Sequence, residues 1–131
     1  MKAMKGLAVF AMVLAMQTTA MAKEQVFTAH VAADGTLLRQ SPNWITDIKH
    51  QPQPNYFSLY KLTLNKQVVR QDPGFCTVSA IDASSYDRQL HGQAKVTGKP
   101  LAEKVAVMTQ LVDKKGPSGD NALEFLLMCT R

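Results

Sequence analysis

The sequence has few of the groups that most often carry chemistry. Its 131 residues include two cysteines, three histidines and seven glycines. No serine lies in a Gly-x-Ser-x-Gly turn, so the strained nucleophile of an α/β-hydrolase is missing. The closest glycines, Gly116 and Gly119, are not followed by the Lys-Ser or Lys-Thr of a phosphate-binding loop. These absences predict no catalytic residue, no cofactor and no enzymatic activity.

Metal and nucleic-acid sites find no support either. His30, His50 and His91 show no His-x-His or His-x-x-x-His spacing and have no cysteine close by, so no metal site is predicted. The 15 lysine and arginine residues are interspersed with ten aspartate and glutamate residues. No basic stripe that could neutralise phosphates is visible, and we expect no nucleic-acid partner.

The first 22 residues have the three parts of an export signal. Lys2 and Lys5 give a positive start, residues 7–16 are all apolar, and residues 20–22 are Ala-Met-Ala, a small-residue cleavage site. A ten-residue helix is about 15 Å long, half of a bilayer core of about 30 Å, so an uncleaved membrane anchor is the weaker interpretation. We predict a cleaved signal peptide, a mature chain from Lys23, no transmembrane anchor and a periplasmic or secreted protein.

The two cysteines predict a disulfide that stabilises this small domain. Cys76 and Cys129 enter an oxidising compartment together, and both lie in apolar, strand-like runs. One disulfide is therefore predicted, with two buried free thiols as the alternative. A catalytic dithiol is not indicated, because neither cysteine belongs to a Cys-x-x-Cys pair.

Short alternating segments separated by turn residues fill the mature chain. Residues 26–31 alternate with a period of two, and Asp34-Gly35 predicts a tight reversal into a second strand at Leu37. Pro52 and Pro54 remove backbone donors and hold their predecessors extended, so residues 51–55 are predicted to be a loop. Further strands are expected over residues 44–50, 56–64, 75–83, 94–96 and 123–130, and a long irregular connection over 84–93.

Residues 101–112 fit two patterns. Pro100 at a first-turn position and apolar residues at helical spacing favour a helix. Alternation through Val105, Val107 and Leu111 favours a strand, which we prefer. Seven or eight short strands at a spacing of about ten residues indicate an all-β fold. We predict a single antiparallel, jelly-roll-like β-sandwich over residues 23–131.

Residues 31–41 are Val-Ala-Ala-Asp-Gly-Thr-Leu-Leu-Arg-Gln-Ser. This run is similar to the Val-x-Ala-Asp-Gly-Thr-Leu-x-Arg-x-Ser-like opening of small secreted bacterial β-sandwich proteins of unassigned function. The similarity continues with a Tyr-x-Leu-x-Leu strand at 60–64, a cysteine strand at 74–80 and an ending at Asp120, Phe125 and Cys129. The resemblance implies a compact jelly roll akin to the trimeric heads of complement-type and phage-tail-tip domains. It therefore implies a homotrimer that binds rather than catalyses.

Aromatic residues around the predicted 51–55 loop are the candidates for a binding surface. Exposed Trp and Tyr side chains dominate recognition surfaces, because they bury much area with few rotors to freeze. We select Trp44, Tyr56 and Phe57, together with His91, as this surface. Core packing is the alternative interpretation, above all for the nearby Tyr60.

Three functional hypotheses follow from these features. The first is an exported, non-enzymatic binding or structural β-domain, a surface or envelope assembly subunit or a recognition head for a protein or surface ligand. The second is a periplasmic inhibitor or immunity protein that blocks a toxin or hydrolase by inserting the 51–55 or the 84–93 loop. The third and weakest is a small hydrolase that uses His91 with Asp82 or Asp87.

Overall fold

The fold is known from a computed structural model, which describes residues 25–113, 116–117 and 120–131. The predicted signal peptide lies outside these residues. The described elements are β1 (Val26–Val31), β2 (Leu37–Ser41), β3 (Ile45–Gln53), β4 (Phe57–Leu64), β5 (Phe75–Ala80), α2 (Tyr86–His91), β6 (Gly92–Val96), β7 (Lys104–Asp113), β8 (Gly116–Pro117) and β9 (Phe125–Thr130).

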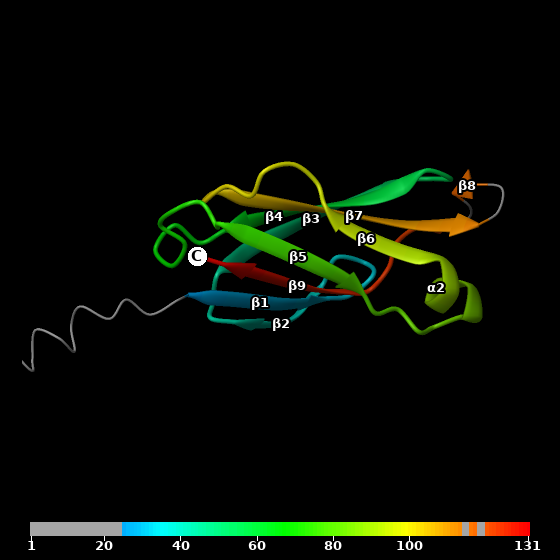
Figure 1. Cartoon of the computed structure of the whole chain (residues 1–131), viewed down its shortest axis with the longest axis horizontal. Helices are drawn as coiled ribbons and strands as arrows, with labels where there is room; N and C mark the ends of the chain where they lie inside the picture. Colours follow the sequence, from blue (N-terminus) through cyan, green and yellow to red (C-terminus); the bar gives the residue numbers. More distant parts are fainter. Residues whose placement is uncertain (1–24, 114–115, 118–119) are drawn as a thin grey trace, which may run out of the picture.

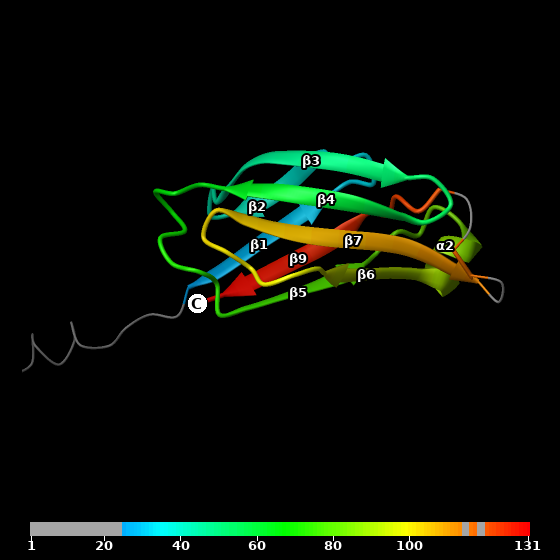
Figure 2. The same cartoon turned by 90° about the horizontal axis from the view of Figure 1, so that it is seen from above.

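Two antiparallel sheets pack face to face (Figure 1). One has the strand order β2-β1-β9-β5 and the other the order β3-β4-β7-β6, with β8 paired to β7. The first and last long strands, β1 and β9, thus lie side by side at the centre of one sheet, and β4 and β7 do so in the other (Figure 2). These two sheets confirm the predicted single antiparallel β-sandwich.

Alternation along each strand builds the core between the sheets. On β4 the inward residues Tyr60 and Leu62 are buried, while Lys61 on the other side is exposed. On β9 the inward Phe125 and Leu127 are buried in the same way. The two inner faces interdigitate, as the side-chain period of two requires in a sandwich. The core therefore follows directly from the pattern that identified the strands.

Two expectations about local structure are wrong. Residues 51–53 belong to β3 rather than to a loop, because β3 is an edge strand and the missing donor of Pro52 faces no neighbour. Within the expected irregular connection, residues 86–91 form helix α2. Ser85 caps this helix by accepting a hydrogen bond from the Arg88 N–H at 3.2 Å. The preferred strand in the ambiguous region is confirmed by β7, and the helical alternative for 101–112 is excluded.

The turn between β1 and β2 requires glycine at position 35. Gly35 has a φ of +92°, and an added Cβ would lie 2.9 Å from the Cβ of His50. Next to it, hydrogen bonds from Thr36 lower the pKa of the Asp34 carboxyl. Gly98 also has a positive φ, +80°, but an added Cβ there would meet nothing within 4 Å.

The two glycines make a matched pair for a stability measurement. Gly98→Ala should cost about 1 kcal/mol, because only the left-handed backbone is strained. Gly35→Ala should cost about 1 kcal/mol more, because the added methyl also displaces His50. Urea unfolding of both variants measures the difference. Equal losses of unfolding free energy in the two variants would show that the methyl group added at position 35 does not displace His50.

Candidate functional site

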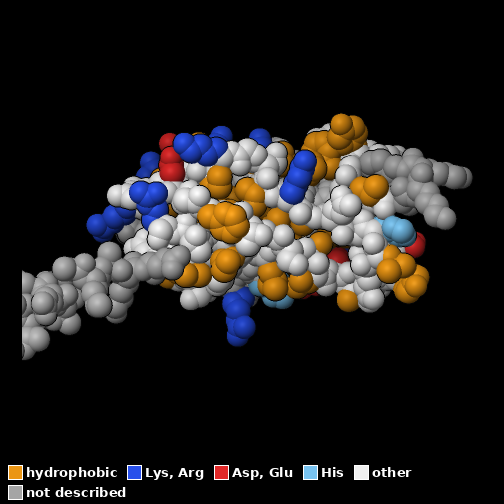
Figure 3. All heavy atoms as spheres, viewed as in Figure 1, with side chains coloured by type: hydrophobic (Ala, Val, Ile, Leu, Met, Phe, Trp, Pro, Cys, Tyr) orange, Lys and Arg blue, Asp and Glu red, His pale blue; other side chains and the backbone are white. Residues whose placement is uncertain are grey.

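The outer face of the β2-β1-β9-β5 sheet is unusually apolar for a surface. Leu126 and Met128 point outward from the central strand β9 and are 44% and 38% exposed. Phe75 on β5 and Val26 on β1 are also exposed, at 57% and 47%. Figure 3 shows several hydrophobic side chains on the side of the molecule that carries β5 and β9, with charged groups mostly at the margins. Strand β9 is thus apolar on both sides. Its inner side packs in the core, and its outer side is exposed and could contact a partner.

A hollow of about 320 Å³ lies on this face. Its floor is β9, from Leu126 to Met128, and its walls come from the neighbouring strands. The wall residues are uncharged on the β5 side, with Thr77, Val78 and Ser79. A concave, mainly apolar surface with a few polar groups is the usual form of a ligand-binding site.

Charged and titratable groups are confined to one end of the hollow. His30 on β1 contacts Glu124, with 2.5 Å between Nε2 and Oε2. Arg39 lies directly opposite His30 in the register of β2 with β1, and it also lines the hollow. His30 and Glu124 are both about one-third exposed. At this end of the hollow, groups that can form hydrogen bonds with a partner lie beside the apolar floor. We refer to the floor, walls and this polar end together as the outer-sheet site.

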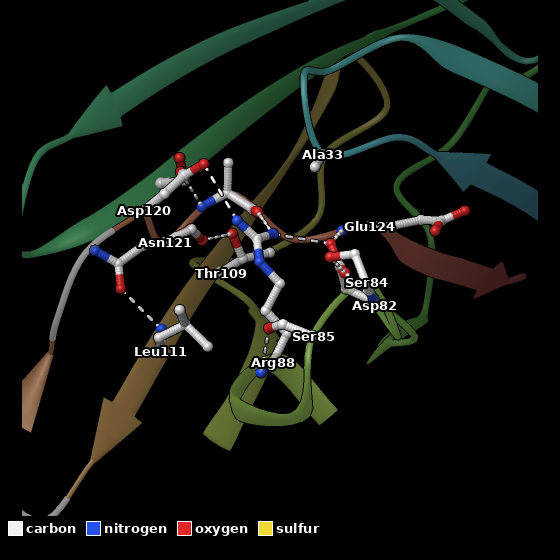
Figure 4. A network of polar contacts seen from close by, with 12 residues as sticks. Ala33, Asp82, Ser84, Ser85, Arg88, Thr109, Leu111, Asp120, Asn121 and Glu124 are labelled. Carbon is white, nitrogen blue, oxygen red and sulfur yellow. Dashed lines mark hydrogen bonds and ion pairs between the residues drawn. The ribbon is translucent and has the colours of Figure 1, made fainter. Parts of the chain in front are cut away.

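A polar network anchors the segment that leads into β9 (Figure 4). Arg88 extends from α2, donates to the carboxylates of Asp82 and Asp120 at 3.0 and 3.2 Å, and donates to the carbonyl of Ala122 at 2.6 Å. Asp82 also accepts hydrogen bonds from Ser84 and from the Glu124 N–H. The network therefore fixes the residues just before β9, including Glu124 at the polar end of the outer-sheet site.

Asn121 ties the same segment to the other sheet. Its side-chain oxygen accepts a hydrogen bond from the Leu111 N–H at 2.8 Å, and its carbonyl accepts one from the Thr109 hydroxyl at 2.6 Å. The Tyr60 hydroxyl nearby donates to the Ala33 carbonyl at 2.6 Å, and burial raises the pKa of Tyr60. These bonds satisfy the polar groups at this end of the core and hold both sheets together.

The pKa of Asp82 falls from 3.8 to about 2. Burial alone would raise it, but hydrogen bonds from Ser84 and the Glu124 N–H, together with the Arg88 charge, outweigh burial. The Asp82 side chain is 7% exposed, so this stabilisation of the carboxylate is little screened by water.

The depressed pKa predicts a stability that depends on pH. The unfolded chain takes up the proton more readily than the folded chain, so the contribution is complete above about pH 5 and is lost as the pH falls through about 2. We expect a loss of about 2 kcal/mol over this range. Urea unfolding at pH 6 and pH 3 should show a smaller loss in Asp82→Asn than in the wild type. Identical pH profiles would contradict the assignment.

The predicted binding surface is wrong for Trp44. This residue is fully buried, packs against Phe27 with ring centroids 5.4 Å apart, and donates its indole N–H to the Thr28 carbonyl. Trp44 lies in the turn segment just before β3, which begins at Ile45, so it is not bound by the alternation of the strand and is buried together with Ile45. Strict alternation could not reveal this, because it treats these neighbours as opposite faces.

The other residues of the predicted surface lie near one end of the sandwich. Tyr56 is 63% exposed at the β3–β4 turn and packs edge-to-face on the half-buried Phe57. His91 is half-buried at the C-terminal end of α2. The structure gives no contact between His91 and either aromatic ring within the described residues, so they do not form a single cluster there.

The predicted disulfide between Cys76 and Cys129 is confirmed. It joins directly opposite residues of β5 and β9. Disulfides form and persist in oxidising compartments. Among the described residues, no helix is long and apolar enough to cross a membrane.

Asp82, a carboxylate considered for a hydrolase, and His50, which was not considered for one, each have partners of their own. Asp82 is held by Arg88 rather than by a histidine. His50 stacks on Tyr60 with 4.5 Å between ring centroids, and its Nε2 lies 2.8 Å from the Ser58 hydroxyl. Ser58 is buried on the inner face of β4, so this pair belongs to the packed interior.

Sequence analysis missed the outer-sheet site, although one signal was present. In residues 125–129 the outward Leu126 and Met128 are as apolar as the inward residues between them. This uninterrupted apolar run is typical of a strand covered on both faces. The prediction for residues 123–130 was only that they form a strand, so the exposed side was not identified.

No family model, curated protein or solved structure matches this chain. The resemblance to complement-type and phage-tail-tip heads, and the homotrimer that it implies, therefore stay predictions.

Proposed function

We propose that this chain is an exported, non-enzymatic binding domain that acts as an assembly subunit or recognition head. The outer-sheet site is its binding surface. The observation that carries this proposal is the apolar hollow over β9, in which Leu126 and Met128 are exposed. Exposed apolar patches on small soluble domains commonly mark interaction sites. The disulfide supports an oxidising location.

The partner of this site presents an apolar surface with a polar group at one edge. Leu126 and Met128 provide the apolar contact, and the flexible Met side chain adapts to the shape of a partner. His30 and Glu124 at the polar end supply hydrogen bonds that fix its orientation. The anchoring of Glu124 by Asp82 holds this end in place before binding.

A photo-cross-linking residue tests the proposal in the organism that makes the protein. With this residue in place of Met128, irradiation should give a defined protein adduct. The matched control replaces Thr63, which is exposed on the central strand β4 of the other sheet. Adducts from position 128 but not from position 63 support the outer-sheet site. No adduct at either position, or equal adducts at both, would contradict it.

The β3–β4 turn supports the inhibitor hypothesis as a second candidate. Tyr56 is largely exposed there, and Pro52, Pro54 and Phe57 line a neighbouring pocket of about 220 Å³. An exposed aromatic side chain in a tight turn is suited to insertion into a partner's cleft. By contrast, residues 86–91 form a helix secured by Arg88, so the 84–93 segment is not an irregular loop.

An inhibitor would depend on Tyr56 rather than on β9. Tyr56→Ala should leave stability within about 0.5 kcal/mol of the wild type, because the side chain is exposed. If Tyr56→Ala abolishes capture of a one-to-one protein partner while Leu126→Lys does not, the inhibitor hypothesis replaces the assembly hypothesis.

A further inference from the structure

The outer face of the β3-β4-β7-β6 sheet is basic, unlike the apolar outer face of the other sheet. One exposed lysine comes from each strand: Lys49, Lys61, Lys104 and Lys95. Lys61 points outward because its neighbours Tyr60 and Leu62 are buried, and the strand register places the other three on the same face. Figure 3 shows several Lys and Arg side chains along the upper margin, on the side where Figure 1 draws β4 and β7. No basic run marks these lysines in the sequence, because folding alone brings them together.

Two of these lysines repel each other. Lys49 lies directly opposite Lys61 in the register of β3 with β4, and like charges in that position destabilise a sheet. Asp47 is the one acid among the outward side chains that the structure describes on this face, and its register partner is Thr63. Within the described part of the chain, none of the four lysines forms an ion pair. The face therefore holds positive charge that the chain itself does not neutralise.

Apolar and aromatic groups accompany the lysines on this face. Met108 on β7 lies directly opposite Leu59 on one side and Lys95 on the other, and both apolar side chains are half-buried. At one end of the face the β3–β4 turn exposes Tyr56, and the Gln110 side chain on β7 holds this turn by donating to the Tyr56 carbonyl at 2.8 Å. Tyr, Trp and basic side chains around an apolar surface are typical of proteins that contact the polar boundary of a bilayer.

The kind of cation on this face favours an extended anionic surface over a single bound anion. Arginine has a rigid fork that suits two-point recognition of one carboxylate or phosphate, whereas lysine is a point charge on a flexible stem. All four cations here are lysines. The hollow beside Lys95 and Met108 has a volume of only about 100 Å³, below the range of about 300 to 1,000 Å³ for ligand pockets. Lysine stems can lie along the apolar surface while their ammonium groups reach phosphates.

We propose that the outer face of the β3-β4-β7-β6 sheet docks this protein onto an anionic phospholipid bilayer. The ammonium groups of the four lysines contact the lipid phosphates, and the exposed Tyr56 ring lies at the level of the headgroups. The chain rests on the bilayer through this face. Because the two sheets pack face to face, the outer-sheet site then points away from the lipid and stays open to its partner. The inference goes beyond the proposed function, and the two can fail or succeed separately.

Co-sedimentation with lipid vesicles tests the docking. The wild type should bind vesicles of phosphatidylglycerol and phosphatidylcholine in equal parts and should not bind vesicles of phosphatidylcholine alone. The combined variant Lys49→Gln and Lys61→Gln should bind the anionic vesicles at least about tenfold more weakly at low salt. The matched control, Arg70→Gln and Arg131→Gln, removes the same net charge from two exposed residues that line a hollow with Gln25 beside the other sheet. This control should retain most of the binding, and all samples share the same N-terminal residues.

Salt and stability separate docking from other causes. Binding of the wild type should fall as salt rises, because the Debye length shrinks from about 10 Å at 0.1 M to about 3 Å at 1 M. Urea unfolding should show that Lys49→Gln with Lys61→Gln is at least as stable as the wild type, because a like-charge contact is removed. Equal binding to both kinds of vesicle, or equal losses in the variant and its control, would overturn the inference. Retention by heparin, a soluble anionic glycan, without binding to anionic vesicles would assign the face to a polysaccharide instead.

Discussion

Replacing both cysteines, in the variant Cys76→Ala and Cys129→Ala, should lower the free energy of unfolding by about 4 kcal/mol. The disulfide closes a loop with a sequence separation of 53 residues, and loop-closure entropy predicts a loss of this size. The disulfide also joins β5, an edge strand of its sheet, to the central strand β9, so it restrains the position of β5. Urea unfolding of the variant and of the reduced wild type should give similar losses, which separates the lost link from any effect of the alanines.

A loss below about 1 kcal/mol in both samples would contradict this account. It would mean that the unfolded chain is already compact around these strands, so that the disulfide restrains little. A large loss in the variant but not in the reduced protein would instead point to the cavity left at the buried Cys129.

Removing Arg88 should cost about 3 kcal/mol in Arg88→Ala, because Asp82 then remains buried without its cation. The Ala122 carbonyl also loses its hydrogen bond. Thermal and urea unfolding measure the loss, and Arg70→Ala, at an exposed arginine between β4 and β5, is the matched control with an expected change below about 0.5 kcal/mol.

A double-mutant cycle distinguishes the ion pair from general packing. Arg88→Met combined with Asp82→Asn removes both charges, so part of the loss in Arg88→Met alone should be recovered. Strictly additive losses would show that Arg88 acts through its contacts with the chain rather than through Asp82. The Arg88 variants should also weaken binding at the outer-sheet site, because Arg88 helps to place Glu124.

The strands were predictable because one physical rule determines most of them. Where one side of a strand faces the core, apolar residues recur with a period of two, and β1, β4 and β9 follow this rule closely. The choice of strand over helix for β7 was also correct. There the pattern through Val105 and Val107 agreed with the spacing of the whole chain. The disulfide could be predicted for a similar reason, because both cysteines lie in apolar strand patterns.

The errors arose where the rule is interrupted. Trp44 lies just before β3 and is buried beside Ile45, the first residue of the strand, so alternation does not apply to this pair. Proline was compatible with β3 because that strand lies at an edge. Helix α2 is short, has no buried residue and depends on its Ser85 cap and on the Arg88 contacts. Such an element has no apolar periodicity and is determined by tertiary contacts.

The outer-sheet site could be predicted only in part. The apolar composition of residues 125–129 was visible, but the exposure of one side depends on which strands flank β9 and on what covers the sheet. The network of Arg88, Asp82 and Asp120 joins residues from separate parts of the chain, which no local pattern relates. The site therefore exists only in the assembled sheet.

Native mass spectrometry tests the central claim most directly. The protein would be recovered without reduction from the envelope and the medium of its own host, as wild type and as the combined variant Leu126→Lys and Met128→Lys. We predict that the wild type is found in a specific complex and that the variant, folded and disulfide-bonded, is found alone. The Thr63→Lys control should behave like the wild type. If the wild type is found alone, or if the variant forms the same complex, the outer-sheet site is not the binding surface.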